Sequence, residues 1–208
     1  MNRRNILLTC MLFLCVCSLA GCGKKESGQQ DGAAPDSNVA EIGKDGVVTN
    51  NIEEDFSSGY YDEESLEEFI LKEAGRYNSR AGEDRIAVKK LEVKKETARL
   101  TMQYQSVEDF GAFNGYTIFC GTIAQAYDEG YNLDTELMDV DGEGVSITRD
   151  QLLEMGSRKI IIAELPADEW LTIRASGKIL YQSGAESVKK DTALISGGGT
   201  SPVYLVYK

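Results

Sequence analysis

Histidine is absent from this chain of 208 residues, and its absence excludes several kinds of chemistry. No Ser-His-Asp triad, Cys-His pair or histidine general base can form. Zinc sites that use histidine are excluded for the same reason. Basic residues are also few, with 22 Lys and Arg against 34 Asp and Glu, so the net charge is −12. Because no basic stripe is present to neutralise phosphates, no nucleic-acid partner is expected.

Cysteine is scarce outside the N-terminal region. Four of the five cysteines lie within the first 22 residues, and Cys120 is the only one after Cys22. A disulfide within residues 23–208 is therefore excluded. The hydrophobic sequence around Cys120 predicts a small buried side chain rather than a reactive thiol.

The first 22 residues have the order of features typical of an exported protein. Arg3 and Arg4 precede an apolar run, residues 6–19, that is too short for an ordinary membrane-spanning helix. Small residues then lead into Cys22. These features fit a signal in which Cys22 has a specific role. The alternative is a generic secretory signal in which Cys22 occurs by chance.

The sequence Leu19-Ala20-Gly21-Cys22 resembles the lipobox of bacterial lipoproteins. The resemblance implies cleavage by signal peptidase between Gly21 and Cys22 and a diacylglyceryl group on the Cys22 thiol. It also implies a lipid-anchored protein at the outer face of the cell membrane. Each buried CH₂ contributes about 0.8 kcal/mol, so two or more acyl chains would make the attachment lasting.

The composition divides the chain into three parts. Residues 1–21 are the expected lipoprotein signal peptide. Residues 22–37 comprise the lipidated cysteine and a tether rich in Gly, Ser, Gln and charge. As a flexible coil, this tether spans roughly 20 Å. Residues 38–208 are expected to form one folded domain, because their length suits a single core.

Alternating apolar residues and turn signals predict several strands in the domain. Hairpins are expected over residues 38–52, 86–105 and 169–182, the second with a tight turn near Lys95-Glu96. An edge strand is expected over residues 188–195. The run Ile160-Ile161-Ile162 predicts a central strand that is covered on both faces. The last strand is expected over residues 203–207.

Capping residues and apolar periodicity predict the helices. Asp62 is expected to cap an amphipathic helix ending near Ser79, and Ser106 a short one. Thr122 and Thr148 each open a capping box. Together these elements predict an α+β fold with a mostly antiparallel sheet and three or four helices in a single domain.

The domain resembles small clostridial-type lipoproteins in a few short sequences. These are FNG at residues 113–115, AYDEGYNLD at 126–134 and GKILYQS at 177–183. The resemblance implies no particular activity.

Residues 139–150 contain the best candidate for a metal site. Asp139, Asp141 and Glu143, followed by Gly144, match the start of a calcium-binding EF-hand loop, and Asp150 occupies its twelfth position. However, Asp150 also lies in the capping box of Thr148, where an acidic residue already favours the helix. We favour the alternative, an acidic turn that serves a structural role, so no cofactor is expected; calcium at this loop is the other possibility.

Three functions remain open from the sequence. The leading hypothesis is a non-enzymatic, membrane-anchored module that binds a partner protein or a glycan, with Tyr60 and Tyr61 as a candidate ligand surface. The first alternative is a carboxylate-dependent envelope enzyme acting on glycan. The second is a calcium-stabilised module. A carboxylate pair with a raised pKa, lying in a cleft, would favour the enzyme, whereas an exposed aromatic or apolar patch would favour the binding module.

Overall fold

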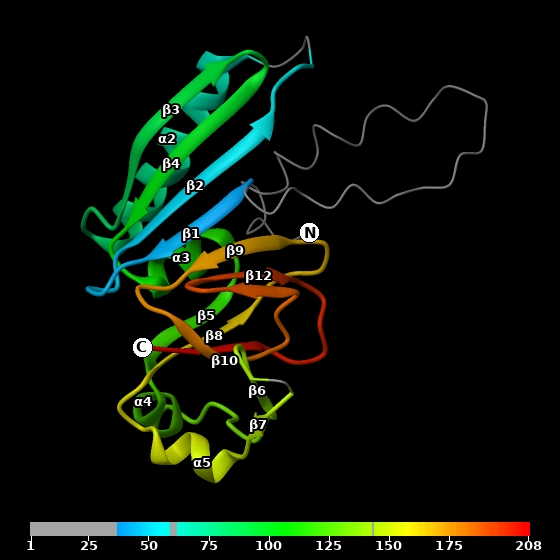
Figure 1. Ribbon diagram of the computed structural model, residues 1–208. Coiled ribbons are helices and arrows are strands. Elements are labelled where there is room, and N and C mark those ends of the chain that lie inside the picture. Colours follow the sequence, from blue (N-terminus) through cyan, green and yellow to red (C-terminus); the bar gives the residue numbers. More distant parts are fainter. Residues whose placement is uncertain (1–36, 59–61, 143) are drawn as a thin grey trace, which may run out of the picture.

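A computed structural model describes residues 37–58, 62–142 and 144–208 (Figure 1). Thirteen strands in this part of the chain form two sheets, and four helices pack against them. All strand pairs are antiparallel except one. The expected α+β fold in a single domain is confirmed, because both sheets contribute to one shared core.

The larger sheet has seven strands in the order β11-β12-β9-β1-β2-β4-β3. The strands are β1 (Asn38–Ile42), β2 (Val48–Asp55), β3 (Ile86–Lys94), β4 (Thr97–Tyr104), β9 (Trp170–Arg174), β11 (Ser187–Lys189) and β12 (Thr192–Ser196). The predicted turn between β3 and β4 is confirmed, with Lys95 and Glu96 both at positive φ. Such a turn matches the twist of an antiparallel pair.

Strand β1 joins the N-terminal and C-terminal parts of this sheet. It pairs antiparallel with β2 and parallel with β9. Its first residue is bonded to both neighbours, since Asn50 Nδ2 donates to Asn38 Oδ1 at 2.8 Å and Asn38 Nδ2 donates to the Trp170 carbonyl at 3.3 Å. Asn50 is almost fully buried, so its side chain is satisfied by β1 rather than by water.

The smaller sheet has six strands in the order β5-β8-β13-β10-β6-β7. The strands are β5 (Thr117–Thr122), β6 (Leu137–Asp139), β7 (Ser146–Ile147), β8 (Lys159–Glu164), β10 (Ile179–Ser183) and β13 (Val203–Tyr207). The prediction that residues 160–162 form a strand covered on both faces is confirmed. Ile161 faces the core shared by the sheets, and Ile160 and Ile162 face the opposite side.

Each helix begins directly after the capping residue that was predicted from the sequence. They are α2 (Glu63–Ala81), α3 (Val107–Asn114), α4 (Ile123–Asp128) and α5 (Arg149–Glu154). The side chains of Asp62 and Ser106 accept hydrogen bonds from backbone N–H groups of the first turns of α2 and α3. Thr122 and Thr148 form complete capping boxes with Gln125 and Gln151.

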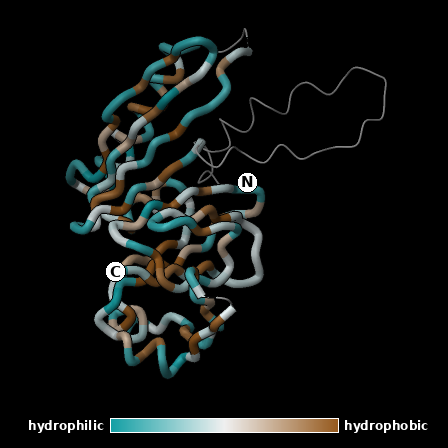
Figure 2. The backbone as a smooth tube through the Cα atoms, viewed as in Figure 1, coloured by the Kyte–Doolittle hydropathy of each residue, from teal (hydrophilic) through white to brown (hydrophobic). Residues whose placement is uncertain are grey.

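The main core lies between one face of the seven-stranded sheet and the elements packed on it. Helix α2 covers β3 and β4, behind them in Figure 1, whereas the six-stranded sheet covers β1, β9 and β12. Phe110 of α3 is completely buried in this core. Figure 2 shows hydrophobic residues recurring along the strands where the two sheets meet.

A second core lies on the other face of the six-stranded sheet. Helices α4 and α5 pack there through Ile123, Ala126 and Leu152, against Ile160 and Val206 of the sheet. The six-stranded sheet is therefore buried on both faces, which explains the unbroken apolar sequences of its central strands.

Two predicted strand arrangements are wrong. Residues 169–174 and 178–182 do not form a hairpin, because β9 belongs to the seven-stranded sheet and β10 to the six-stranded sheet. Both edges of β9 are paired, one with β1 and the other with β12, and the chain crosses to the other sheet between Arg174 and Ile179. Residues 188–195 form two strands instead of one, β11 and β12, with a turn at Lys190, which has positive φ.

Candidate functional site

Several residues predicted to be functional lie outside the described residues. These are the cleavage-site residue Gly21, the lipidation residue Cys22, the aromatic pair Tyr60 and Tyr61, and Glu143 of the calcium loop. Their predicted roles stay predictions. Among the described residues, no helix is long and apolar enough to cross a membrane.

The described part of the predicted calcium loop is held by internal contacts. Asp139 Oδ1 accepts hydrogen bonds from the backbone N–H groups of Asp141 and Gly142, at 2.8 and 2.9 Å. The Asp141 carboxylate forms an ion pair with Lys178. Asp150 lies in the first turn of α5, as its position in the capping box predicted. Within residues 37–58, 62–142 and 144–208, no three potential ligands from His, Cys, Asp and Glu converge on a metal site. The structural role of this turn stays a prediction, and calcium stays its alternative.

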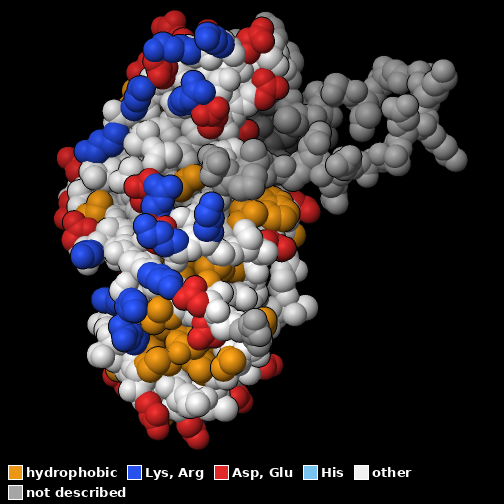
Figure 3. Space-filling view, viewed as in Figure 1, with side chains coloured by type: hydrophobic (Ala, Val, Ile, Leu, Met, Phe, Trp, Pro, Cys, Tyr) orange, Lys and Arg blue, Asp and Glu red, His pale blue; other side chains and the backbone are white. Residues whose placement is uncertain are grey.

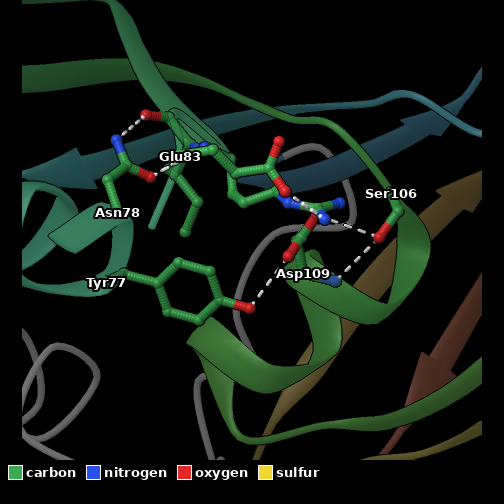
Figure 4. Close-up of polar contacts among 7 residues, drawn as sticks. Tyr77, Asn78, Glu83, Ser106 and Asp109 are labelled. Atoms are coloured by element: carbon green, nitrogen blue, oxygen red, sulfur yellow. Dashed lines mark hydrogen bonds and ion pairs between the residues drawn. The ribbon is translucent and has the colours of Figure 1, made fainter. Parts of the chain in front are cut away.

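A buried carboxylate, Asp109, connects α2, α3 and the start of β3 (Figure 4). Its Oδ1 accepts a hydrogen bond from the Tyr77 hydroxyl at 3.0 Å, and its Oδ2 accepts one from Ser106 Oγ at 3.0 Å. Arg85 Nη1 lies 3.7 Å from the same Oδ2, and its Nη2 lies 2.5 Å from Glu83 Oε1. Both carboxylate oxygens are therefore occupied by protein donors.

The neighbouring Asn78 adds a second connection between α2 and β3 in the same place (Figure 4). Its Oδ1 accepts hydrogen bonds from the backbone N–H groups of Arg85 and Ile86, both at 2.9 Å, and its Nδ2 donates to the Ile86 carbonyl at 2.8 Å. Since the polar groups of Asp109 and Asn78 are all paired, these two residues fix α2 against the sheet and against α3. Sequence reasoning missed this role of Asp109, although its position three residues after the Ser106 cap was visible.

Glu169 and Glu54 form a carboxylate pair with raised pKa values. The pKa of Glu169 is raised to about 7, mainly because burial removes hydration from its carboxylate. The negative charges of Asp168 and Glu54 raise the pKa further. Partial burial and the adjacent Asp55 also raise the pKa of Glu54. Sequence reasoning did not single out this pair, because the residues come from the end of β2 and the start of β9. A carboxyl group that titrates near neutrality can act as a general acid.

We predict that Glu169→Gln stabilises the protein at high pH. The folded-state pKa exceeds the ordinary value near 4.5, so the folded protein binds the proton more tightly than the unfolded chain. The stabilising contribution of this proton is complete below pH 4.5 and is lost as the pH rises through about 7. Because Glu169 is only partly buried and solvent screens its charge, the gain at pH 8 is limited to about 1 kcal/mol. Urea unfolding at pH 8 and pH 4 measures it, and equal effects at the two values would contradict the assigned cause.

Cys120 is less enclosed than the sequence predicted. Its side chain is partly buried against the main core, and its Sγ lies 3.4 Å from the Tyr207 hydroxyl. Burial raises the pKa of the Cys120 thiol.

We expect the Cys120 thiol to react slowly in the folded protein, because the thiolate is the reactive form and burial disfavours it. Labelling with a thiol probe at pH 7.5 should be much slower in native protein than in urea-unfolded protein. Cys22 would be blocked by lipid, and the Cys120→Ala variant gives the background. Equal native and unfolded rates would show an accessible thiol.

The outer face of the seven-stranded sheet carries charges that are already paired. Arg99 on β4 donates two hydrogen bonds to Glu53 on β2, at 2.8 and 3.0 Å. Arg174 on β9 donates to Glu41 on β1 at 2.5 Å. Figure 3 looks onto this face and shows basic and acidic side chains interspersed. Because these charges neutralise one another, the face has little excess charge to attract a ligand.

The end of the molecule that carries α4 and α5, lowest in Figure 1, has different surface chemistry. We call residues 123–155 the α4–α5 end; it contains α4, β6, β7 and α5. Tyr127, Met138 and Val145 are about half exposed there, and Arg149 lies over the Tyr127 ring at 5.8 Å from its centroid. Figure 3 shows hydrophobic side chains gathered at this end, with acidic side chains along its lower margin and basic side chains at its left margin. This surface combines exposed apolar groups with excess negative charge.

Comparison with known proteins does not assign this surface a function. No family model, no characterised protein and no solved structure matches the chain.

Proposed function

We propose that this protein is a membrane-anchored cell-envelope lipoprotein whose folded domain is a non-enzymatic module that binds another protein. The observation that carries the binding role is the α4–α5 end. Large apolar side chains that remain exposed in one region of a soluble domain are typical of interaction surfaces. The paired charges on the outer face of the seven-stranded sheet offer no comparable surface.

The position of the α4–α5 end is consistent with an N-terminal anchor. The tether would enter the domain at Asn38, the first residue of β1 in the seven-stranded sheet. The α4 and α5 helices lie beyond the six-stranded sheet, on its opposite face. A partner bound there would be separated from the anchor point by the body of the domain.

The lipid anchor is tested by Cys22→Ser. Without the thiol, no diacylglyceryl group can be attached, so we expect uncleaved precursor and no incorporation of radiolabelled fatty acid. Wild-type protein provides the reference for both measurements. Normal processing and membrane partitioning of the variant would contradict the proposed anchor.

The binding role is tested with a photo-crosslinking residue placed at position 138 of the anchored protein in intact cells. We expect a discrete crosslinked product with another protein. The same residue at position 71, which is equally exposed on α2, serves as the control. Absence of a product at position 138, or equal products at both positions, would contradict a binding surface at the α4–α5 end.

The raised pKa of Glu169 favours a second candidate function, a carboxylate-dependent enzyme acting on envelope glycan. In that case Glu169 would be the general acid and Glu54 the second carboxylate. Purified protein should then release new reducing ends from cell-wall glycan, and Glu169→Gln should abolish the release. We rank this function second because it depends on the electrostatics of one carboxylate pair, whereas the binding role depends on several exposed side chains.

A further inference from the structure

We infer that the partner of the α4–α5 end is a basic protein segment that carries large apolar side chains. This inference rests on the proposed function and specifies its partner. Two independent properties of the same surface support it, the exposed apolar residues and the charge.

The apolar property is concentrated at this end of the molecule. Of the four large hydrophobic residues that are exposed in the described part of the chain, three lie here: Tyr127 at 52%, Met138 at 48% and Val145 at 58% exposure. Met138 of β6 pairs with Ser146 of β7, and Val145 precedes Ser146 in the chain. A flexible methionine and an aromatic ring are side chains that adapt to and anchor a partner.

The charge at this end is strongly negative. Residues 123–155 contain nine acidic residues and one basic residue, Arg149. Seven of these acidic side chains are exposed: Asp128, Glu129, Asp134, Glu136, Asp141, Asp150 and Glu154. Lys178 pairs with Asp141, and the exposed Arg158 and Lys159 border this end, but acidic side chains remain in excess. Such a surface attracts a basic partner and repels nucleic acid and anionic membranes.

The basic side chain of Arg149 shows how a partner cation could be accommodated at this end. Arg149 places its guanidinium over the ring of Tyr127, 5.8 Å from the centroid, while half of the Tyr127 side chain stays exposed. A lysine or arginine of the partner would find a similar combination of aromatic surface and nearby carboxylates. An acidic or uncharged segment would gain only the apolar contact.

The experiment uses the full-length protein in uncharged detergent and three fluorescent peptides of equal length. One peptide has lysines flanking two leucines, the second has glutamates flanking two leucines, and the third has lysines flanking two serines. We expect saturable binding of the lysine–leucine peptide alone, measured by fluorescence anisotropy against micelles without protein. Raising the salt to about 0.5 M should weaken binding, because that concentration shortens the range of surface charges.

Variants locate the binding surface. Two variants are made, the double variant Met138→Ser/Val145→Ser and the single variant Glu136→Lys. Each should weaken binding of the lysine–leucine peptide about tenfold, a loss of about 1.4 kcal/mol. The matched controls lie on α2, where Leu71→Ser removes the fourth exposed hydrophobic residue and Glu67→Lys reverses an exposed acidic charge. Both controls should bind as the wild type does.

The outcomes separate this inference from the proposed function. Equal binding of the glutamate–leucine peptide, or an equal loss in the α2 variants, would overturn the basic partner at the α4–α5 end. If no peptide binds but the crosslinker at position 138 still captures a protein, the proposed function stands and this inference fails. If the crosslinker captures none, the proposed function fails.

Discussion

Gly197→Ala should destabilise the protein by about 3 kcal/mol or more, which is among the largest effects of a point substitution. A Cβ atom at Gly197 would lie 1.7 Å from the carbonyl oxygen of Pro166 and 2.6 Å from its carbonyl carbon. Both contacts are with backbone, so no side-chain rotation can relieve them. The segment is also held in place, because Gly197 N–H donates to the Glu169 carbonyl at 2.8 Å. Equilibrium unfolding in urea measures the loss.

Gly199→Ala provides the control in the same loop. A Cβ atom there would meet only Ser201 O, at 3.4 Å, which is an ordinary contact. We therefore expect a change within about 0.5 kcal/mol, as for most surface substitutions. If the two variants lost similar stability, the loop rather than the close approach to Pro166 would be responsible.

Phe110→Ala should cost about 3–5 kcal/mol, as is usual when a buried aromatic residue is truncated in a core. Phe110 is completely buried in α3. Its ring meets Tyr104 edge-on, with centroids 5.2 Å apart, and Tyr116 at 5.7 Å. The substitution removes both contacts and leaves a cavity where α3 meets the two sheets. Thermal and urea unfolding should both show a lower stability.

Leu71→Ala is the control for this prediction. Leu71 lies on α2 with 51% of its surface exposed, so removing its side chain leaves no cavity. We expect a change within about 0.5 kcal/mol. A loss of less than 1 kcal/mol for Phe110→Ala would show that the core around α3 closes over the vacated space.

The elements that depend on neighbouring residues could be predicted from the sequence. The caps at Asp62, Ser106, Thr122 and Thr148 were all correct, because each side chain bonds to a backbone N–H only three residues away. The turn at residues 95–96 was correct for the same reason. Local chemistry decides such features, whichever elements pack against them.

The pairing of strands could not be predicted in the same way. Residues 169–174 and 178–182 have the local sequence of a hairpin. In the structure, however, β9 is hydrogen-bonded on both edges, to β1 and to β12. The partner β1 lies about 130 residues earlier in the chain, and nothing in the sequence around β9 indicates it. Non-local pairing of this kind is decided by how the complete core is buried.

In the candidate sites, too, local features could be predicted from the sequence and long-range contacts could not. Asp109 was visible as part of a helix start, but its contact with Tyr77 depends on the packing of α2. The Glu54–Glu169 pair needs the ends of β2 and β9 to be brought together by β1. The acidic character of residues 123–155 could be counted in the sequence, whereas the exposure of Tyr127 and Met138 could not.

The position of β1 determines how the domain would respond to mechanical load. A force applied through the residues before β1 would act first on Asn38, the N-terminal residue of the strand. Because β1 is hydrogen-bonded to β2 on one side and to β9 on the other, it cannot peel away one bond at a time from a free edge. Both ladders would have to shear together, with the side-chain bonds of Asn38 breaking at the start. With the membrane anchor and the partner that we propose, the domain would thus transmit tension between the two without unfolding first at β1.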